Sequence, residues 1–129
     1  MNEKRSVHGC SKMILDGKPY IWVSGGWGED FIRQQSTEYL DLFNINEGWK
    51  FGPALPYSIR FHRLVASEDL KTIYSTGGLG TRGDILKLQC SGSTPNTCAF
   101  KQSTSQTKVN RNDHVVLPLS NSVAERLCT

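Results

Sequence analysis

The strongest constraint on the fold of this chain is an internal repeat with a period of about 52 residues. Two glycine pairs, Gly25-Gly26 and Gly77-Gly78, each end an apolar run and lie 52 residues apart. A histidine opens a strand-like run in each unit, at His8, His62 and His114. Self-similarity at a fixed spacing of this length is typical of repeat architectures. The sequence therefore predicts similar units placed side by side.

Each of the first two units carries four short runs whose alternation or length is typical of β-strands. After each glycine pair a polar loop leads to a third run, at residues 37–43 and 84–90. A fourth run follows a turn-rich break and contains Trp49 in the first unit and Phe100 in the second. Four short strands in about 50 residues is the size of one antiparallel sheet of a propeller. Because no segment has a sustained helical period, we expect an all-β fold.

On these residues the chain resembles the kelch repeat family. Its units have a histidine-opened first strand, a second strand that ends in Gly-Gly, a tyrosine in the third strand and a tryptophan in the fourth. The first unit matches all of these elements, with His8, Gly25, Gly26, Tyr39 and Trp49.

The second unit of the resemblance keeps His62, Gly77 and Gly78 but has an Ile85-Leu86 strand and Phe100 in place of the tyrosine and tryptophan. The third rests on His114 and the run after it. The resemblance implies a kelch-type β-propeller fragment, with one blade at residues 8–58, a second at 62–110 and an incomplete blade at 114–129. A ring of this kind needs about four to eight blades. We therefore expect a longer chain, or other copies, to supply the remaining blades.

The repeated residues are interpreted as structural. Glycine has no Cβ and allows the backbone to turn where a neighbouring chain comes close, which suits the glycine pairs. Tyr39 and Trp49 supply large buried areas between adjacent sheets. The three histidines recur at the repeat spacing, so each is expected to pack at a strand start rather than to join the others in a metal site.

Several function classes are disfavoured by the residue pattern. The net charge of +3 is scattered along the chain, which argues against nucleic-acid binding. No run approaches the roughly 18 apolar residues of a membrane span. Residues 78–83 match G-x-G-x-x-G, but an alternating run follows in place of the helix that a dinucleotide site requires. No nucleophile elbow, acid–base pair or metal-ligand spacing is present, so we predict no cofactor, no metal and no catalytic residue.

Four cysteines bear on the cellular compartment. Cys90 and Cys98 flank a turn-rich loop between two expected strands, so a hairpin would bring them within disulfide range. Two ordinary thiols are the alternative. A Cys90–Cys98 disulfide favours an oxidising, extracellular compartment, and its absence favours the cytoplasm. Cys10 and Cys128 are too far apart in the sequence to be assigned a pairing.

The resemblance implies a non-catalytic module for protein–protein interaction, because propellers bind partners through the loops at the ring openings. In the loop at residues 27–36, Trp27, Phe31 and Arg33 form an aromatic and cationic set of the kind enriched at interface hot spots. The alternative for Trp27 is packing onto its own blade. The alternative function is part of a kelch-fold enzyme, such as a copper oxidase or a sugar-acid epimerase. A ubiquitin-ligase adaptor stays open for a longer parent chain.

Overall fold

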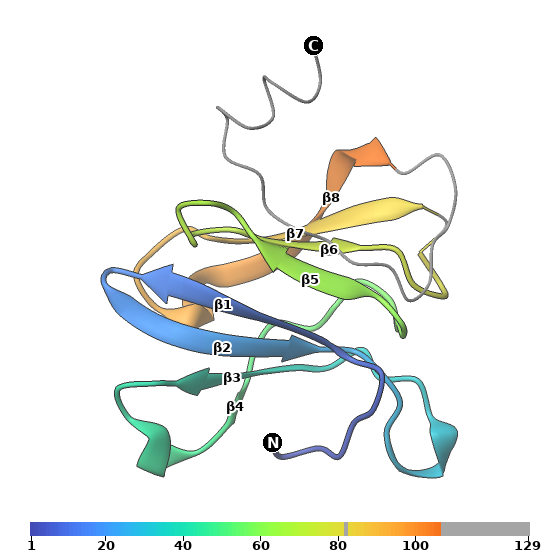
Figure 1. Cartoon of the computed structure of the whole chain (residues 1–129), viewed down its shortest axis with the longest axis horizontal. Coiled ribbons are helices and arrows are strands. Elements are labelled where there is room, and N and C mark those ends of the chain that lie inside the picture. The colour runs from blue at the N-terminus through green and yellow to red at the C-terminus, as the bar shows by residue number, and fades with distance from the viewer. Residues whose placement is uncertain (82, 107–129) are drawn as a thin grey trace.

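The computed structural model describes residues 1–81 and 83–106, which form two four-stranded antiparallel β-sheets (Figure 1). The first sheet consists, in spatial order, of β1 (Gly9–Leu15), β2 (Lys18–Ser24), β3 (Thr37–Asp41) and β4 (Lys50–Phe51). The second consists of β5 (Arg63–Ala66), β6 (Ile73–Thr76), β7 (Asp84–Cys90) and β8 (Cys98–Gln106). Single turns of 3-10 helix lie in three connections: η1 (Glu29–Phe31), η2 (Ile45–Glu47) and η3 (Pro95–Thr97).

The prediction of an all-β chain with two four-stranded antiparallel units is confirmed. Within each sheet every strand pairs with the next one along the chain, so each sheet is a meander. The run after the G-x-G-x-x-G match is β7, a strand. Among the described residues, no helix has the length and apolar character needed to cross a membrane. The predicted third unit at 114–129, with His114, lies outside the described residues.

The two sheets pack face to face around a common apolar core (Figure 1). Its buried side chains come from both sheets: Met13, Leu15, Tyr20, Trp22, Tyr39, Leu64, Ile73, Leu88 and Cys98. The first strands of the two sheets, β1 and β5, lie side by side. A Cβ added at Gly9 would lie 2.7 Å from Nε2 of His62 and 2.7 Å from Cγ of Leu64. Glycine therefore permits the close approach of the two first strands.

The backbone contacts of the glycine pairs repeat between the units. An added Cβ at Gly26 would lie 2.5 Å from the carbonyl oxygen of Ser6, and one at Gly78 would lie 2.6 Å from that of Arg60. Both glycines have φ in the left-handed region, at +95° and +91°. Both features exclude a side chain at either position.

Left-handed backbone also repeats at residues that carry side chains. The residues directly before the histidines, Val7 and Phe61, have φ of +49° and +58°. The turn residues Asp16 and Leu70, also 54 positions apart, have φ of +48° and +58°. Such values are uncommon outside glycine, asparagine and aspartate. The repeat is thus preserved in the chain path even where the residue types differ.

The strand register shows which residue of the second sheet occupies the position of Tyr39, and it is not one of the pair Ile85-Leu86 that the sequence comparison suggested. Tyr39 lies opposite Trp22, with ring centroids 5.2 Å apart. In the second sheet the matching pair is Tyr74 and Lys87, with the Lys87 ammonium 5.9 Å from the Tyr74 ring. The position expected at Ile85-Leu86 therefore falls on Lys87, because the loops before β3 and β7 differ in length.

Candidate functional site

The loop from β2 to β3 carries the three residues predicted to bind a partner. Its first part continues as an extended strand at Trp27, which forms antiparallel bridges to Ser6 on one side and to Arg33 on the other. The Trp27 amide donates to the Ser6 carbonyl at 2.9 Å, and the Ser6 amide donates to the Trp27 carbonyl at 2.8 Å. Side chains of directly opposed residues lie on the same side of a pair. The Arg33 side chain therefore leaves the backbone on the side of the Trp27 ring.

The turn η1 holds two large apolar side chains in solvent. Phe31 is 76% exposed and Ile32 is 65% exposed. The Phe31 ring meets Trp27 edge to face, at 5.2 Å between centroids and an interplanar angle of 87°. Asp30 and Phe31 both have φ of +58°, a conformation that costs free energy for residues with a Cβ. Strained backbone thus presents the Phe31 side chain at the surface.

Arg60, from the connection between β4 and β5, completes this cluster. Its guanidinium carbon lies 4.4 Å from the centroid of the Trp27 ring and 5.8 Å from that of Phe61. Both distances are within the range of cation–π attraction. The connection belongs to the second sheet, so the cluster combines residues from both units. We call the six residues Trp27, Phe31, Ile32, Arg33, Arg60 and Phe61 the Trp27 surface.

The structure brings Trp27 and Phe31 together and places Arg33 across from Trp27 on the paired backbone. Sequence reasoning missed Arg60 as a member. The available signal was its place in the connecting segment directly before the second histidine, next to an aromatic residue. The sequence did not indicate that Phe61, directly after Arg60, has a left-handed backbone conformation.

The charges around the Trp27 surface are unevenly paired. Lys4 binds Glu29 of the turn at 2.7 Å, and both side chains are mostly exposed. Neither Arg33 nor Arg60 forms an ion pair with any of the described residues. The surface therefore keeps two guanidinium groups without carboxylate partners beside two exposed apolar side chains.

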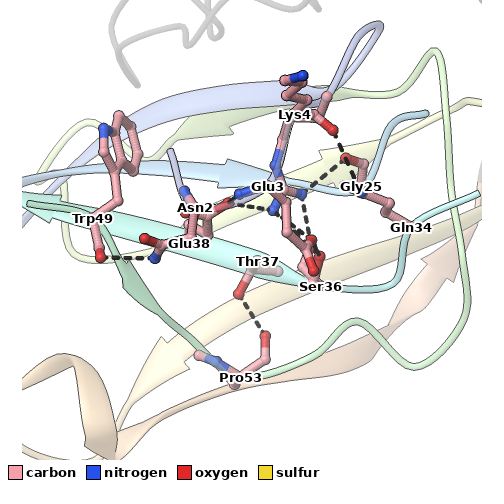
Figure 2. Close-up of polar contacts among 11 residues, drawn as sticks. Asn2, Glu3, Lys4, Gly25, Gln34, Ser36, Thr37, Glu38, Trp49 and Pro53 are labelled. Carbon is pink, nitrogen blue, oxygen red and sulfur yellow. Dashed lines mark hydrogen bonds and ion pairs between the residues drawn. The ribbon is translucent and has the colours of Figure 1, made fainter. Parts of the chain in front are cut away.

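A second polar cluster lies where the N-terminal segment crosses β3 (Figure 2). The side chains of Arg5 and Glu38 are fully buried and form an ion pair at 2.7 Å. Arg5 also donates to the carbonyl oxygens of Gly25 and Ser36, each at 3.1 Å. Glu38 also accepts hydrogen bonds from the backbone amides of Asn2 and Glu3. Nearly every polar atom of the buried pair is thus used in holding the N-terminal segment.

Burial opposes ionisation of Glu38, but the Arg5 side chain and the two backbone amides outweigh it and lower its pKa. A carboxylate so fully bonded has no free lone pair facing solvent, and its low pKa keeps it charged. The Arg5–Glu38 pair therefore acts as a structural tie.

The repeat histidines lie at the junction of the units. His62 is fully buried, and its Nε2 lies 2.8 Å from the Ser24 hydroxyl oxygen at the end of β2. Burial, together with the charge of Arg5, lowers the pKa of His8. Within residues 1–81 and 83–106, no three histidine, cysteine or acidic side chains are grouped as metal ligands.

The remaining predicted residues lie in or near the core. Trp49 lies directly before β4 and is half-buried, and its carbonyl oxygen accepts a 2.8 Å hydrogen bond from the Asn2 side chain. Phe100 lies on β8 and packs against the buried core residues of both sheets.

The predicted Cys90–Cys98 disulfide is confirmed. The two residues are paired across β7 and β8, at the base of the hairpin loop that contains η3. Cys10 is an exposed free thiol, and Cys128 lies outside the described residues.

Comparison with known proteins adds no family assignment: no protein-family model matches the chain, and no curated protein matches it.

Proposed function

We propose that this chain is a non-catalytic protein-binding module built from kelch-type propeller blades. The proposal of blades is supported by two meander sheets that repeat at 52 to 54 residues, pack face to face and bring their first strands together. In this arrangement the segment that connects β4 to β5 crosses to the glycine pair and the N-terminal segment of the first sheet. The Gly26 amide donates to the Ile59 carbonyl at 2.8 Å, and the Phe61 amide donates to the Val7 carbonyl at 3.0 Å. Further blades come from a longer chain or from other copies.

The exposure of Phe31 and Ile32 is the observation that carries the binding function. Two neighbouring large apolar side chains lie in solvent, at 76% and 65%, and the backbone of Phe31 is in the left-handed region. Behind them, the packed Trp27 ring and Arg60 guanidinium form a rigid base. Tryptophan and arginine are the residues most enriched at interface hot spots. The Trp27 surface therefore fits a site for a protein partner.

The test compares two similar turns of the same chain. Phe31→Ala/Ile32→Ala removes the apolar side chains near η1, and Phe43→Ala/Ile45→Ala removes the exposed pair near η2, which are 66% and 58% exposed. Each purified full-length variant is checked by circular dichroism and used as bait in quantitative crosslinking and affinity capture. We expect specific partners of the wild-type chain to be lost with the η1 variant and kept with the η2 variant. Equal capture by both variants would contradict the proposal.

The disulfide also supports an oxidising environment for the working protein, because such bonds persist mainly outside the cytosol. An extracellular or cell-surface partner is therefore the first to be sought. Non-reducing mass spectrometry of the natural protein would detect the Cys90–Cys98 linked peptides. Free thiols at both positions would redirect the search to the cytoplasm.

A further inference from the structure

The Trp27 surface contains two buried hydrogen-bond donors without acceptors. Nε of Arg60 and Nε1 of Trp27 are both inaccessible to solvent and have no hydrogen-bond partner among residues 1–81 and 83–106. Most buried polar atoms in folded proteins are paired, and each exception asks for an explanation. Of the buried unpaired atoms in the described residues, these two belong to side chains in cation–π contact, with the Arg60 guanidinium carbon 4.4 Å from the Trp27 ring centroid.

The described part of the chain supplies no acceptor for the Arg60 guanidinium. No hydrogen bond or ion pair involves its side chain, and Glu29, an acid of the neighbouring turn, is bound to Lys4. The guanidinium carbon lies over the Trp27 ring, 4.4 Å from its centroid, so the ring covers one side of the group. Because Nε is buried, a carboxylate can reach this guanidinium only through its two terminal nitrogens, whose N–H groups can donate two parallel hydrogen bonds to it.

The geometry points to a partner segment in which an aspartate or glutamate stands next to a large apolar residue. This inference rests on the proposed binding function and specifies its ligand. The carboxylate binds the free edge of Arg60, and Arg33 on the same side of the paired backbone adds positive charge. The apolar side chain covers Phe31 and Ile32, which are exposed beside Trp27. Charge complementarity and apolar burial thus act on adjacent residues of one short segment.

Selection from a random phage-displayed peptide library tests this inference on the full-length chain. The baits are the wild type, Arg60→Gln, Arg60→Lys, Phe31→Ala/Ile32→Ala and the control Phe43→Ala/Ile45→Ala. We expect peptides selected by the wild type and the control to share an acidic residue next to an aromatic or aliphatic one. A selected peptide, once synthesised, should bind Arg60→Gln about tenfold more weakly or worse, as expected for loss of a charged hydrogen bond. Arg60→Lys keeps the positive charge but cannot donate two parallel hydrogen bonds, so its affinity for the peptide should lie between those of the wild type and Arg60→Gln.

Two different failures are distinguishable in this design. Peptides that need Phe31 and Ile32 but carry no acidic preference, or that bind Arg60→Gln as tightly as the wild type, would overturn the carboxylate inference and leave the binding function standing. Peptides that bind the η1 and η2 variants alike would contradict the binding function itself. Sedimentation of the bait gives a third readout: self-association abolished by Arg60→Gln would mean that a second copy, and not a partner segment, occupies the surface.

Discussion

Where the connecting segment crosses the third strand, the first sheet buries an ion pair and the second sheet buries two aliphatic side chains. Arg5 and Ile59 are equivalent because each lies three residues before a repeat histidine. Glu38 and Leu86 are equivalent by register, since each lies opposite the residue two positions before a glycine pair. Both Ile59 and Leu86 are fully buried in one apolar cluster. The same geometric position thus accepts a salt bridge or a hydrophobic contact.

The neighbouring contact shows the same substitution of chemistry. In the first sheet the Ser36 hydroxyl donates to the Glu3 carboxylate. In the second, the Tyr57 hydroxyl donates to the Asp84 carboxylate at 3.2 Å, with the donor now on the connecting segment. Burial and the negative charge of Asp84 raise the pKa of Tyr57 to about 12, so this donor keeps its proton at neutral pH. The repeat thus preserves a hydroxyl–carboxylate hydrogen bond at this place, but the hydroxyl and the carboxylate have exchanged positions between the two segments.

The largest expected effect comes from breaking one half of the buried pair. Arg5→Ile alone leaves Glu38 without its charged partner in a buried place, and we expect it to lower the free energy of unfolding by about 3–5 kcal/mol. The double variant Arg5→Ile/Glu38→Leu installs the residues of the second sheet. It should recover to within about 2 kcal/mol of the wild type, because buried ion pairs are often replaceable by packed apolar residues. Urea unfolding followed by circular dichroism measures both.

The matched control for the pair is Ile59→Arg in the second sheet, which places a charge opposite Leu86 and should be at least as damaging as Arg5→Ile. If the double variant were as unstable as the sum of its single changes, the two positions would not be interchangeable and the comparison would fail.

The hairpin loops differ in how they are held, and the next effect follows from this. A disulfide closes the β7–β8 loop, whereas the Asp41 carboxylate orders the β3–β4 loop by accepting hydrogen bonds from the Phe43 amide and the Asn44 side chain. Cys90→Ala/Cys98→Ala should cost about 2–3 kcal/mol, as the chain-entropy relation gives for a loop of this length. Asp41→Ala should cost clearly less. Thermal unfolding with and without reductant checks this, since reductant should destabilise the wild type and leave the double variant unchanged.

Two buried serines provide a smaller test at the junction of the sheets. Ser24→Ala removes the hydroxyl at 2.8 Å from Nε2 of the buried His62 and should cost about 1–2 kcal/mol. Ser75 is equally buried, but its hydroxyl has no hydrogen-bond partner in the part of the chain that the structure describes. Ser75→Ala should therefore be neutral or stabilising in the same unfolding experiment. Equal losses for the two changes would show that packing, and not the hydrogen bond, decides the effect.

The smallest effect concerns acid. Glu38 has a lowered pKa, so its contribution to stability is present above the unfolded-state value of about 4.3 and is lost as the pH falls through the folded-state value. Between about pH 5 and pH 2, the wild type should therefore lose stability more steeply than Arg5→Ile/Glu38→Leu. Parallel curves of unfolding free energy against pH would contradict the role given to Glu38.

The sequence predicted the strands and the disulfide because these depend on local pattern. The alternation of apolar and polar residues and the glycine pairs indicate the eight strands. Cys90 and Cys98 are close enough along the chain for a hairpin to join them. The close contact of Trp27 with Phe31 also follows from their proximity in a short loop.

The buried pair and the role of Arg60 could not be predicted in this way. Arg5 and Glu38 are 33 positions apart, and their equivalents in the second unit are aliphatic, so repeat comparison gives no hint of a bond between them. The stacking of Arg60 on Trp27 joins loops of different units. The first contact depends on how the N-terminal segment crosses β3, and the second depends on how one sheet packs on the other. Residue spacing alone encodes neither.

The hydrogen bond from the Gly26 amide to the Ile59 carbonyl has a consequence for how the molecule opens. This amide belongs to the first sheet and its acceptor to the segment leading into the second, so separating the sheets breaks it while each sheet stays intact. Its deuterium exchange rate should therefore report sheet separation, and exchange of the amides between β1 and β2 should report unfolding of a single sheet. If the two rates coincide across denaturant concentrations, the sheets form one cooperative unit; a faster Gly26 amide would identify the junction as the weakest part of the fold.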